Sequence, residues 1–146
     1  MQSAEPQLPN LAVVSAAVEK PKTKGFRRPI LEILEDLQKP VPVRLIKTKV
    51  IKGTKISYIP WPTLIRLLEF YCPGFDWQVK THYHGDRVVV EGSLTIKAAE
   101  GDFTRQATGT EHSDVDNYGD PTSNSEAMAL RRCCGKFGLG LALWEK

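Results

Sequence analysis

The segment Ser123–Trp144 restricts the fold more than any other part of the sequence. Ser123 is followed three residues later by Glu126, which fits a capping box at the start of a helix. Apolar side chains then recur at helical spacing along one face: Ala127, Leu130, Cys134 and Phe137. Gly138 and Gly140 follow, as is common where a helix ends. The segment therefore predicts an amphipathic helix, which needs a partner surface for its apolar face.

The other side of this helix combines positive charge with small residues. Arg132 and Lys136 point away from the apolar stripe, and Arg131 lies on its flank. A cationic edge of this kind can bind a polyanion. A purely solvated face would carry more charge than the uncharged residues found there, which are Met128, Ala129 and Gly135. We expect these residues to form a second packing surface, against a neighbouring subunit.

The sequence before this helix predicts an extended segment, another helix and three antiparallel strands. Val43–Ile59 is rich in β-branched residues, and Gly53 divides it in two. Pro60-Trp-Pro-Thr opens a helix with an apolar stripe of Leu64, Leu67, Leu68 and Tyr71. Turn signals then separate three predicted strands, Phe75–His84, Arg87–Lys97 and Phe103–Glu111. In the second strand, alternation predicts one buried face, made of Val88, Val90, Gly92, Leu94 and Ile96. Strands followed by a helix predict an α+β fold.

The first part of the chain has a different composition. Residues 1–28 are rich in Pro, Ala, Lys and Gln without sustained periodicity, which predicts a flexible leader. A short helix is expected over Pro29–Gln38, burying Ile30, Leu34 and Leu37. We therefore expect a single domain over residues 29–146.

The cysteines and the apolar runs bear on the compartment. Cys133 and Cys134 are adjacent and cannot easily bridge each other, and Cys72 is distant in sequence. No apolar run approaches the roughly 20 residues that span a bilayer, and no secretory signal is recognisable. We expect a reducing intracellular compartment, the cytoplasm with its nucleoid being the simplest.

Charge is unevenly distributed along the chain, although the net charge is only +3. Residues 41–97 carry nine Lys or Arg against four Asp or Glu, whereas residues 98–130 carry one against seven. This segregation predicts a basic face and an acidic loop. A basic face can bind nucleic acid, and it can also bind other kinds of partner.

Motifs for metal binding and catalysis are weak. His82 and His84 share one face of a strand, and His112 and the cysteine pair are available, but no third ligand stands at a suggestive spacing. The acidic loop Asp114–Asp120 resembles a calcium-binding loop only superficially. Counted from Asp114, the fifth position is Tyr118, which has no carboxylate or amide, and the twelfth is Ser125 where such a loop has Glu. Phosphate-binding glycine motifs are absent. We expect no cofactor, no metal and no enzymatic activity.

The basic residues are interleaved with aromatic ones, as in proteins that follow a nucleic-acid backbone. Tyr58, Trp61 and Tyr83 could stack on bases or lie in the core. Contacts to phosphates would be tolerant of base sequence and sensitive to salt. Arg105 is a further basic residue of this surface, and the candidate DNA-binding residues are Lys47, Lys49, Lys52, Lys55, Lys80, Arg87, Arg131, Arg132 and Lys136.

Several of these patterns together resemble a known family. Lys55-Ile-Ser-Tyr-Ile59, a helix and Gly74-Phe-Asp-Trp77 come first, then a hairpin with Gly101-Asp-Phe-Thr-Arg105, then Leu130-Arg-Arg-Cys-Cys-Gly-Lys-Phe-Gly138. In order and spacing, Val43–Trp144 resembles the Rad fifty-two family of single-strand annealing proteins, particularly its compact DdrA-like bacterial and phage branch.

This resemblance implies a fold and a function. The implied fold is a curved three-stranded antiparallel sheet, a β-β-β-α core, packed on the C-terminal helix, with a preceding helix and an extended basic segment. Subunits form rings or helical arcs, and single-stranded DNA lies in a basic groove for annealing without ATP or metal. By position, Arg131 and Arg132 match the pair that grips phosphates, the Lys47–Lys49 segment supplies another groove cation, and Arg87 lies near a secondary DNA contact. Eukaryotic members carry a basic residue where this chain has Gly135.

Three other functions remain open from the sequence. A double-stranded RNA-binding domain shares the helix–three strands–helix order, but its last helix usually begins with lysines, whereas this one begins with Asn124-Ser-Glu126. A metal-dependent nuclease would use His82, His84 and carboxylates of the acidic loop. A protein-interaction module would need no nucleic acid.

Overall fold

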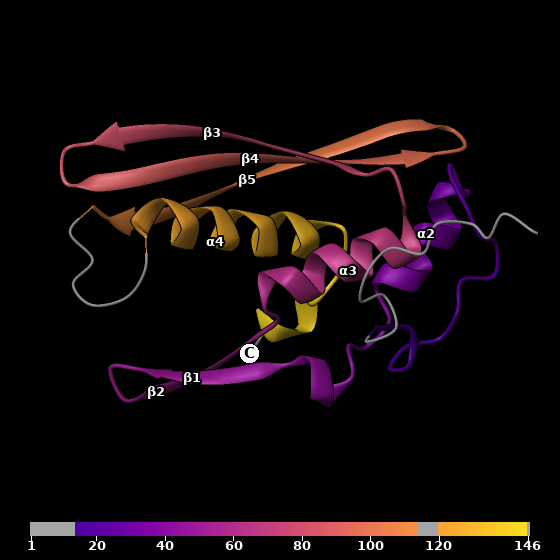
Figure 1. Cartoon of the computed structure of the whole chain (residues 1–146), viewed down its shortest axis with the longest axis horizontal. Helices are drawn as coiled ribbons and strands as arrows, with labels where there is room; N and C mark the ends of the chain where they lie inside the picture. The colour runs from indigo at the N-terminus through magenta and orange to yellow at the C-terminus, as the bar shows by residue number, and fades with distance from the viewer. Residues whose placement is uncertain (1–13, 114–119, 146) are drawn as a thin grey trace, which may run out of the picture.

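The computed structural model describes residues 14–113 and 120–145, and its architecture is α+β as predicted. Figure 1 shows α3 and α4 lying between a three-stranded sheet and a separate β-hairpin. In chain order the elements are α2 (Ile30–Leu37), η1 (Val43–Leu45), β1 (Lys47–Ile51), β2 (Thr54–Tyr58), α3 (Trp61–Tyr71), β3 (Asp76–His84), β4 (Arg87–Ala98), β5 (Gly101–His112), α4 (Pro121–Lys136) and η2 (Leu141–Leu143).

The three-stranded sheet is antiparallel in the order β3-β4-β5. Its central strand β4 alternates strictly, because one face packs on α4 and the other is open. The residues that β4 buries are Val88, Val90, Gly92, Leu94, Ile96 and Ala98. This confirms the predicted strands and the predicted buried face of β4, with strand ends that differ by one or two residues.

The start of α4 differs from the prediction. The helix begins at Pro121, and the cap is Asp120, whose side chain accepts a hydrogen bond from the Thr122 backbone nitrogen at 3.0 Å. The capping box at Ser123 and Glu126 is therefore wrong. Glu126 instead accepts a hydrogen bond from the indole of Trp77 at 3.1 Å. An Asp-Pro pair is a strong helix start in its own right, and the helix begins three residues earlier because of it.

The small residues of α4 pack within this chain, so a subunit contact for Ala129 and Gly135 is the wrong interpretation. Ala129 is fully buried against Val88 and Val90 of β4. Gly135 is buried as well, and a Cβ added there would lie 3.5 Å from the Trp144 ring. The side chains of α4 are small on this side because the helix packs closely on its own sheet as well as on α3.

Helix α4 approaches the sheet closely at Gly109 on β5. A Cβ at this position would lie 1.9 Å from the Ser125 carbonyl oxygen and 2.8 Å from the Ala129 nitrogen, both backbone atoms. No side chain other than hydrogen fits without moving the helix. Gly109 therefore sets the distance between β5 and α4.

The core beneath α4 is formed mainly with α2 and α3. The four apolar residues predicted for α3 are buried as expected: Leu64, Leu67, Leu68 and Tyr71. In α2 the fully buried apolar residues are Ile33 and Leu37, whereas Ile30 and Leu34 are only partly buried. The apolar face of α2 is thus turned from the one expected.

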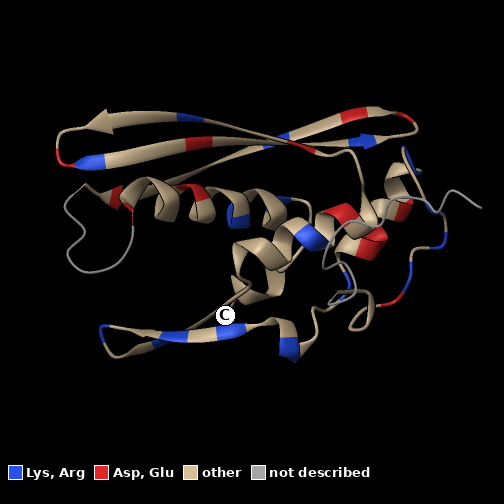
Figure 2. Ribbon diagram, in the orientation of Figure 1, with Lys and Arg blue, Asp and Glu red and all other residues tan. Residues whose placement is uncertain are grey.

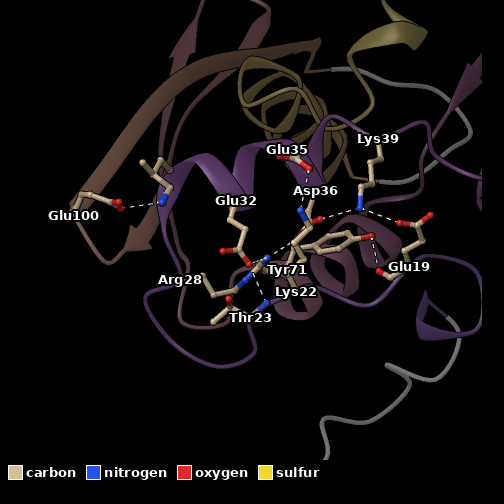
Figure 3. Close-up of polar contacts among 11 residues, drawn as sticks. Glu19, Lys22, Thr23, Arg28, Glu32, Glu35, Asp36, Lys39, Tyr71 and Glu100 are labelled. Carbon is tan, nitrogen blue, oxygen red and sulfur yellow. Dashed lines mark hydrogen bonds and ion pairs between the residues drawn. The ribbon is translucent and has the colours of Figure 1, made fainter.

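Part of the expected leader packs against the domain. Val14 is fully buried in the core, and the Arg28 guanidinium is buried beside α2. Arg28 donates hydrogen bonds to the Tyr71 carbonyl oxygen at 2.6 Å and to Asp36 Oδ2 at 2.5 Å (Figure 3). Lys39 bridges Asp36 to Glu19 in the same network. Val14 and Arg28 therefore pack against the domain although both precede the boundary expected at residue 29.

None of the helices in the described ranges combines the length and the apolar character that crossing a membrane requires.

The close approach at Gly109 predicts a large effect for a small substitution. Gly109→Ala should destabilise the protein by about 2 kcal/mol or more, because overpacking against backbone cannot be relieved by a rotamer change. Urea unfolding followed by circular dichroism measures the change. Thr108→Ala is the matched control, since that side chain is exposed, and should change stability by less than about 0.5 kcal/mol. Equal stability of both variants would contradict the close packing.

The cysteines predict a pH-dependent reactivity. All three are free and buried, and burial raises the pKa of Cys72 to about 12 and the pKa values of Cys133 and Cys134 above their usual range. A raised pKa leaves little thiolate at pH 8, and the thiolate is the reactive form. Mass spectrometry after iodoacetamide treatment at pH 8 should find the native protein unmodified and all three sites modified in urea. Rapid modification of the native protein would mean that the core opens at one of these sites.

Candidate nucleic-acid interface

Two cations from different elements meet on the ring of Tyr58. Lys49 Nζ of β1 and Arg131 Cζ of α4 each lie 5.0 Å from the ring centroid. Arg131 Nε also donates a hydrogen bond to the Ile59 carbonyl oxygen at 2.9 Å. We call Lys49, Tyr58 and Arg131 the Tyr58 cluster. Each cation–π contact contributes roughly 0.5–1 kcal/mol at an exposed site, so the ring holds both cations in defined places.

The register of the β1–β2 hairpin explains how this cluster forms. Lys47 is paired with Tyr58 and Lys49 with Ile56, so both lysines share the face that carries the Tyr58 ring. Both lysine side chains are exposed. The spacing of Lys47 and Lys49 predicts a common face for them, and the register confirms it.

The charge of Arg131 persists in this position. Partial burial lowers the pKa of its guanidinium, while Tyr58 opposes the change. An arginine stays protonated at neutral pH even so, because its ordinary pKa is above about 12. Arg131 therefore presents a full positive charge between α4 and the hairpin.

Arg132 and Lys136 lie on a different side of α4, along the free edge of β5. Arg132 donates a hydrogen bond to the Thr108 carbonyl oxygen at 2.9 Å, and Lys136 to the Gln106 carbonyl oxygen at 2.5 Å. We call these two residues the β5-edge cations. A carbonyl does not neutralise a cation, and neither residue has an ion pair among the residues that the structure describes. Their charge remains available to an anion.

The remaining candidate residues are dispersed. Lys52 lies in the turn of the hairpin, and Lys55 lies on the hairpin face opposite Lys47 and Lys49. Lys80 of β3 is on the open face of the sheet, paired across the strands with Glu91. Arg87 follows the β3–β4 turn, where it donates to Thr110 Oγ1 at 3.1 Å. Figure 2 shows basic residues along the hairpin, which has no Asp or Glu.

The candidate aromatic residues also differ in position. Tyr58 is half-buried within its cluster, whereas Trp61 and Tyr83 are exposed. Trp144 is an aromatic residue that the sequence does not single out, and its indole lies 5.7 Å from Arg132 Cζ. An aromatic residue at the end of an apolar segment carries no sequence signal that separates it from a core residue.

Two of the three histidines, His82 and His112, lie beside carboxylates. His82 Nε2 lies 2.5 Å from Glu91 Oε2, and His112 Nδ1 lies 3.6 Å from Asp86 Oδ2. Within residues 14–113 and 120–145, no group of three or more His, Cys, Asp or Glu residues could hold a metal ion. Most of the acidic loop, residues 114–119, lies outside the described residues.

Comparison with known proteins identifies relatives along most of the chain. No protein-family model matches. DNA repair RAD52-like protein 1, mitochondrial, of Arabidopsis thaliana is 38% identical over 127 residues, which is 85% of this chain and 72% of the relative. DNA repair RAD52-like protein 2, chloroplastic, of the same plant is 33% identical over 144 residues, or 95% of this chain and 72% of the relative. With this identity and coverage, the chain belongs to the RAD52-like family.

Proposed function

We propose that this chain acts in DNA repair and recombination, binding single-stranded DNA by its backbone and annealing complementary strands without ATP or a metal ion. The observation that carries the proposal is the Tyr58 cluster, in which one ring holds cations from two elements. Cations held at fixed positions suit phosphate contacts, which position a strand without reading its bases. The names of both relatives agree with a role in DNA repair.

The candidate cations divide between two neighbouring surfaces in this proposal. The Tyr58 cluster and the exposed Lys47 form the first surface, with Lys52 and Lys55 further along the hairpin. The β5-edge cations, Arg132 and Lys136, form the second, with Lys80 across the sheet. Arg87 is a further contact at the β3–β4 turn. Each point charge that displaces counterions adds to affinity and to its dependence on salt.

We also propose that several copies assemble into a ring or a helical arc. Large apolar side chains are exposed on separate elements, among them Val43 at 84%, Val50 at 69% and Tyr83 at 69%. Contact between subunits would cover such side chains. Many identical weak contacts along one strand would then give high avidity. Light scattering at micromolar protein and negative-stain images test this assembly, and a monomer by both would overturn it.

Two finer assignments complete the proposal. A reducing compartment, such as the cytoplasm with its nucleoid, suits a chain whose three cysteines are free. Membership of the compact DdrA-like branch is a proposal too, because both relatives reported above are plant proteins.

The basic pair predicts a change in the salt dependence of binding. Arg131→Ala combined with Arg132→Ala should weaken binding to a single-stranded oligonucleotide and slow annealing. The slope of log affinity against log salt should fall by about 0.7 for each phosphate that no longer meets a cation. Fluorescence anisotropy over a salt series measures both quantities.

The matched control removes two charges elsewhere. Lys22→Ala combined with Lys24→Ala acts on exposed lysines before α2 and should leave the slope unchanged. Circular dichroism establishes that each variant is folded, since Arg131 also bonds to the Ile59 carbonyl. An unchanged slope in the folded Arg131/Arg132 variant would overturn the site, and preference of the wild type for duplex RNA would overturn the function.

The Tyr58 cluster predicts that the ring matters and the hydroxyl does not. Tyr58→Ala removes both cation–π contacts and should weaken DNA binding about fivefold or more, since roughly 1 kcal/mol of positioning is removed. Tyr58→Phe keeps the ring and should bind within twofold of the wild type. The same anisotropy assay at one salt concentration decides the matter, and equal weakening in the two variants would contradict positioning by the ring.

A further inference from the structure

A groove is lined by the middle of all three strands of the sheet and by the end of α4. Three adjacent rows across the strands line its floor, and the middle row is Val79, Gly92 and Ala107. The rows on either side of it are Gln78, Ser93 and Gln106, and Lys80, Glu91 and Thr108. Its wall is made of Arg132, Gly135 and Lys136 from α4 with Leu141 and Trp144 beyond it.

The floor of the groove carries hydrogen-bonding side chains on either side of the row Val79, Gly92 and Ala107. Gln106 donates to Ser93 Oγ at 2.9 Å, which orients the amide across two strands. Glu91 is the acidic residue of the groove, and its carboxylate is within 2.5 Å of His82 Nε2. Amides and hydroxyls of this kind are the groups that meet the edge of a base or a sugar.

The wall of the groove places an exposed indole beside two cations. Trp144 is 48% exposed although it contacts the helix at Gly135, so part of the ring is open to solvent. Arg132 Cζ lies 5.7 Å from the ring, and Lys136 is on the same wall. The three cations Lys80, Arg132 and Lys136 outnumber the single carboxylate of Glu91, so the groove favours an anion that also carries a flat ring.

We infer that this groove holds one nucleotide of the bound single strand, with its base stacked on Trp144 and its phosphate facing Arg132 and Lys136. The inference rests on the proposed function. It adds a contact to a base, whereas the proposed function involves contacts to phosphates only. Stacking on an aromatic ring tolerates any base, because every base has a π-face. Such a contact is therefore compatible with annealing that is independent of sequence.

The test compares Trp144→Ala and Trp144→Phe with the wild type. The probes are oligothymidylate and an oligomer of the same length made only of abasic sites, bound at one salt concentration. Trp144→Ala should bind oligothymidylate about 5- to 100-fold more weakly. This is the loss of affinity expected when one base no longer stacks on an aromatic ring. Trp144→Ala should bind the abasic oligomer as the wild type does. Trp144→Phe should recover most of the affinity for oligothymidylate.

Control variants and measurements distinguish base stacking from a change in charge, fold or assembly. Phe26→Ala removes an exposed aromatic side chain outside the groove and should leave both affinities unchanged. The salt slope of Trp144→Ala should equal that of the wild type, since its charge is the same. Circular dichroism and light scattering establish that fold and assembly are preserved. Failure of Trp144→Ala to assemble would overturn the inference and assign the groove to a second copy of this chain.

The two levels of the proposal fail in different ways. If the wild type binds neither probe, the proposed function is wrong. If the wild type binds oligothymidylate and Trp144→Ala binds it equally well, the proposed function stands and the nucleotide site in the groove is wrong. Equal weakening on both probes would also overturn it, because the indole would then act on the strand without touching a base.

Discussion

The contact of backbone with backbone at Gly109 governs the arrangement of the whole domain. Because a glycine lets α4 approach β5 this closely, Ala129 reaches the valines of β4 and the helix seals one face of the sheet. The same approach places Arg132 and Lys136 within hydrogen-bonding distance of the β5 edge. Interiors are packed densely enough that one added methyl group is felt, so packing and the placement of charge depend on the same contact.

The helix α4 meets different surroundings on each of its sides, and this explains why adjacent arginines act apart. Consecutive residues of a helix point about 100° away from each other, since one turn takes 3.6 residues. Arg131 therefore reaches the hairpin at Ile59, whereas Arg132 reaches the sheet at Thr108. Arg131 and Arg132 look like a single motif in the sequence, but each belongs to a different surface. Because the two residues are adjacent in the chain, the two surfaces are held at a fixed position relative to each other.

Periodicity predicts the elements well here and the surroundings of single residues less well. The strict alternation of β4 and the stripe of α3 each reflect one buried face, and both are predicted correctly. The predicted subunit contact at Ala129 and Gly135 is wrong, because small residues that pack within the chain look in the sequence like small residues that pack against another subunit. The predicted helix start is wrong because Asp120 and Ser123 are both good caps. Contacts between distant segments, as between Lys49 and Arg131 across Tyr58, follow from the tertiary fold and have no signal in local spacing.

The buried Arg28 has a consequence for where this protein can be cut. Composition suggests trimming the chain to residue 29, yet that cut removes a guanidinium bonded to Asp36 and to the end of α3. Losing one partner of a buried ion pair typically costs about 3–5 kcal/mol, which is a large share of the roughly 5–15 kcal/mol that stabilises a domain. A protein shortened to begin at residue 29 would lose the hydrogen bonds by which Arg28 joins α2 to the end of α3.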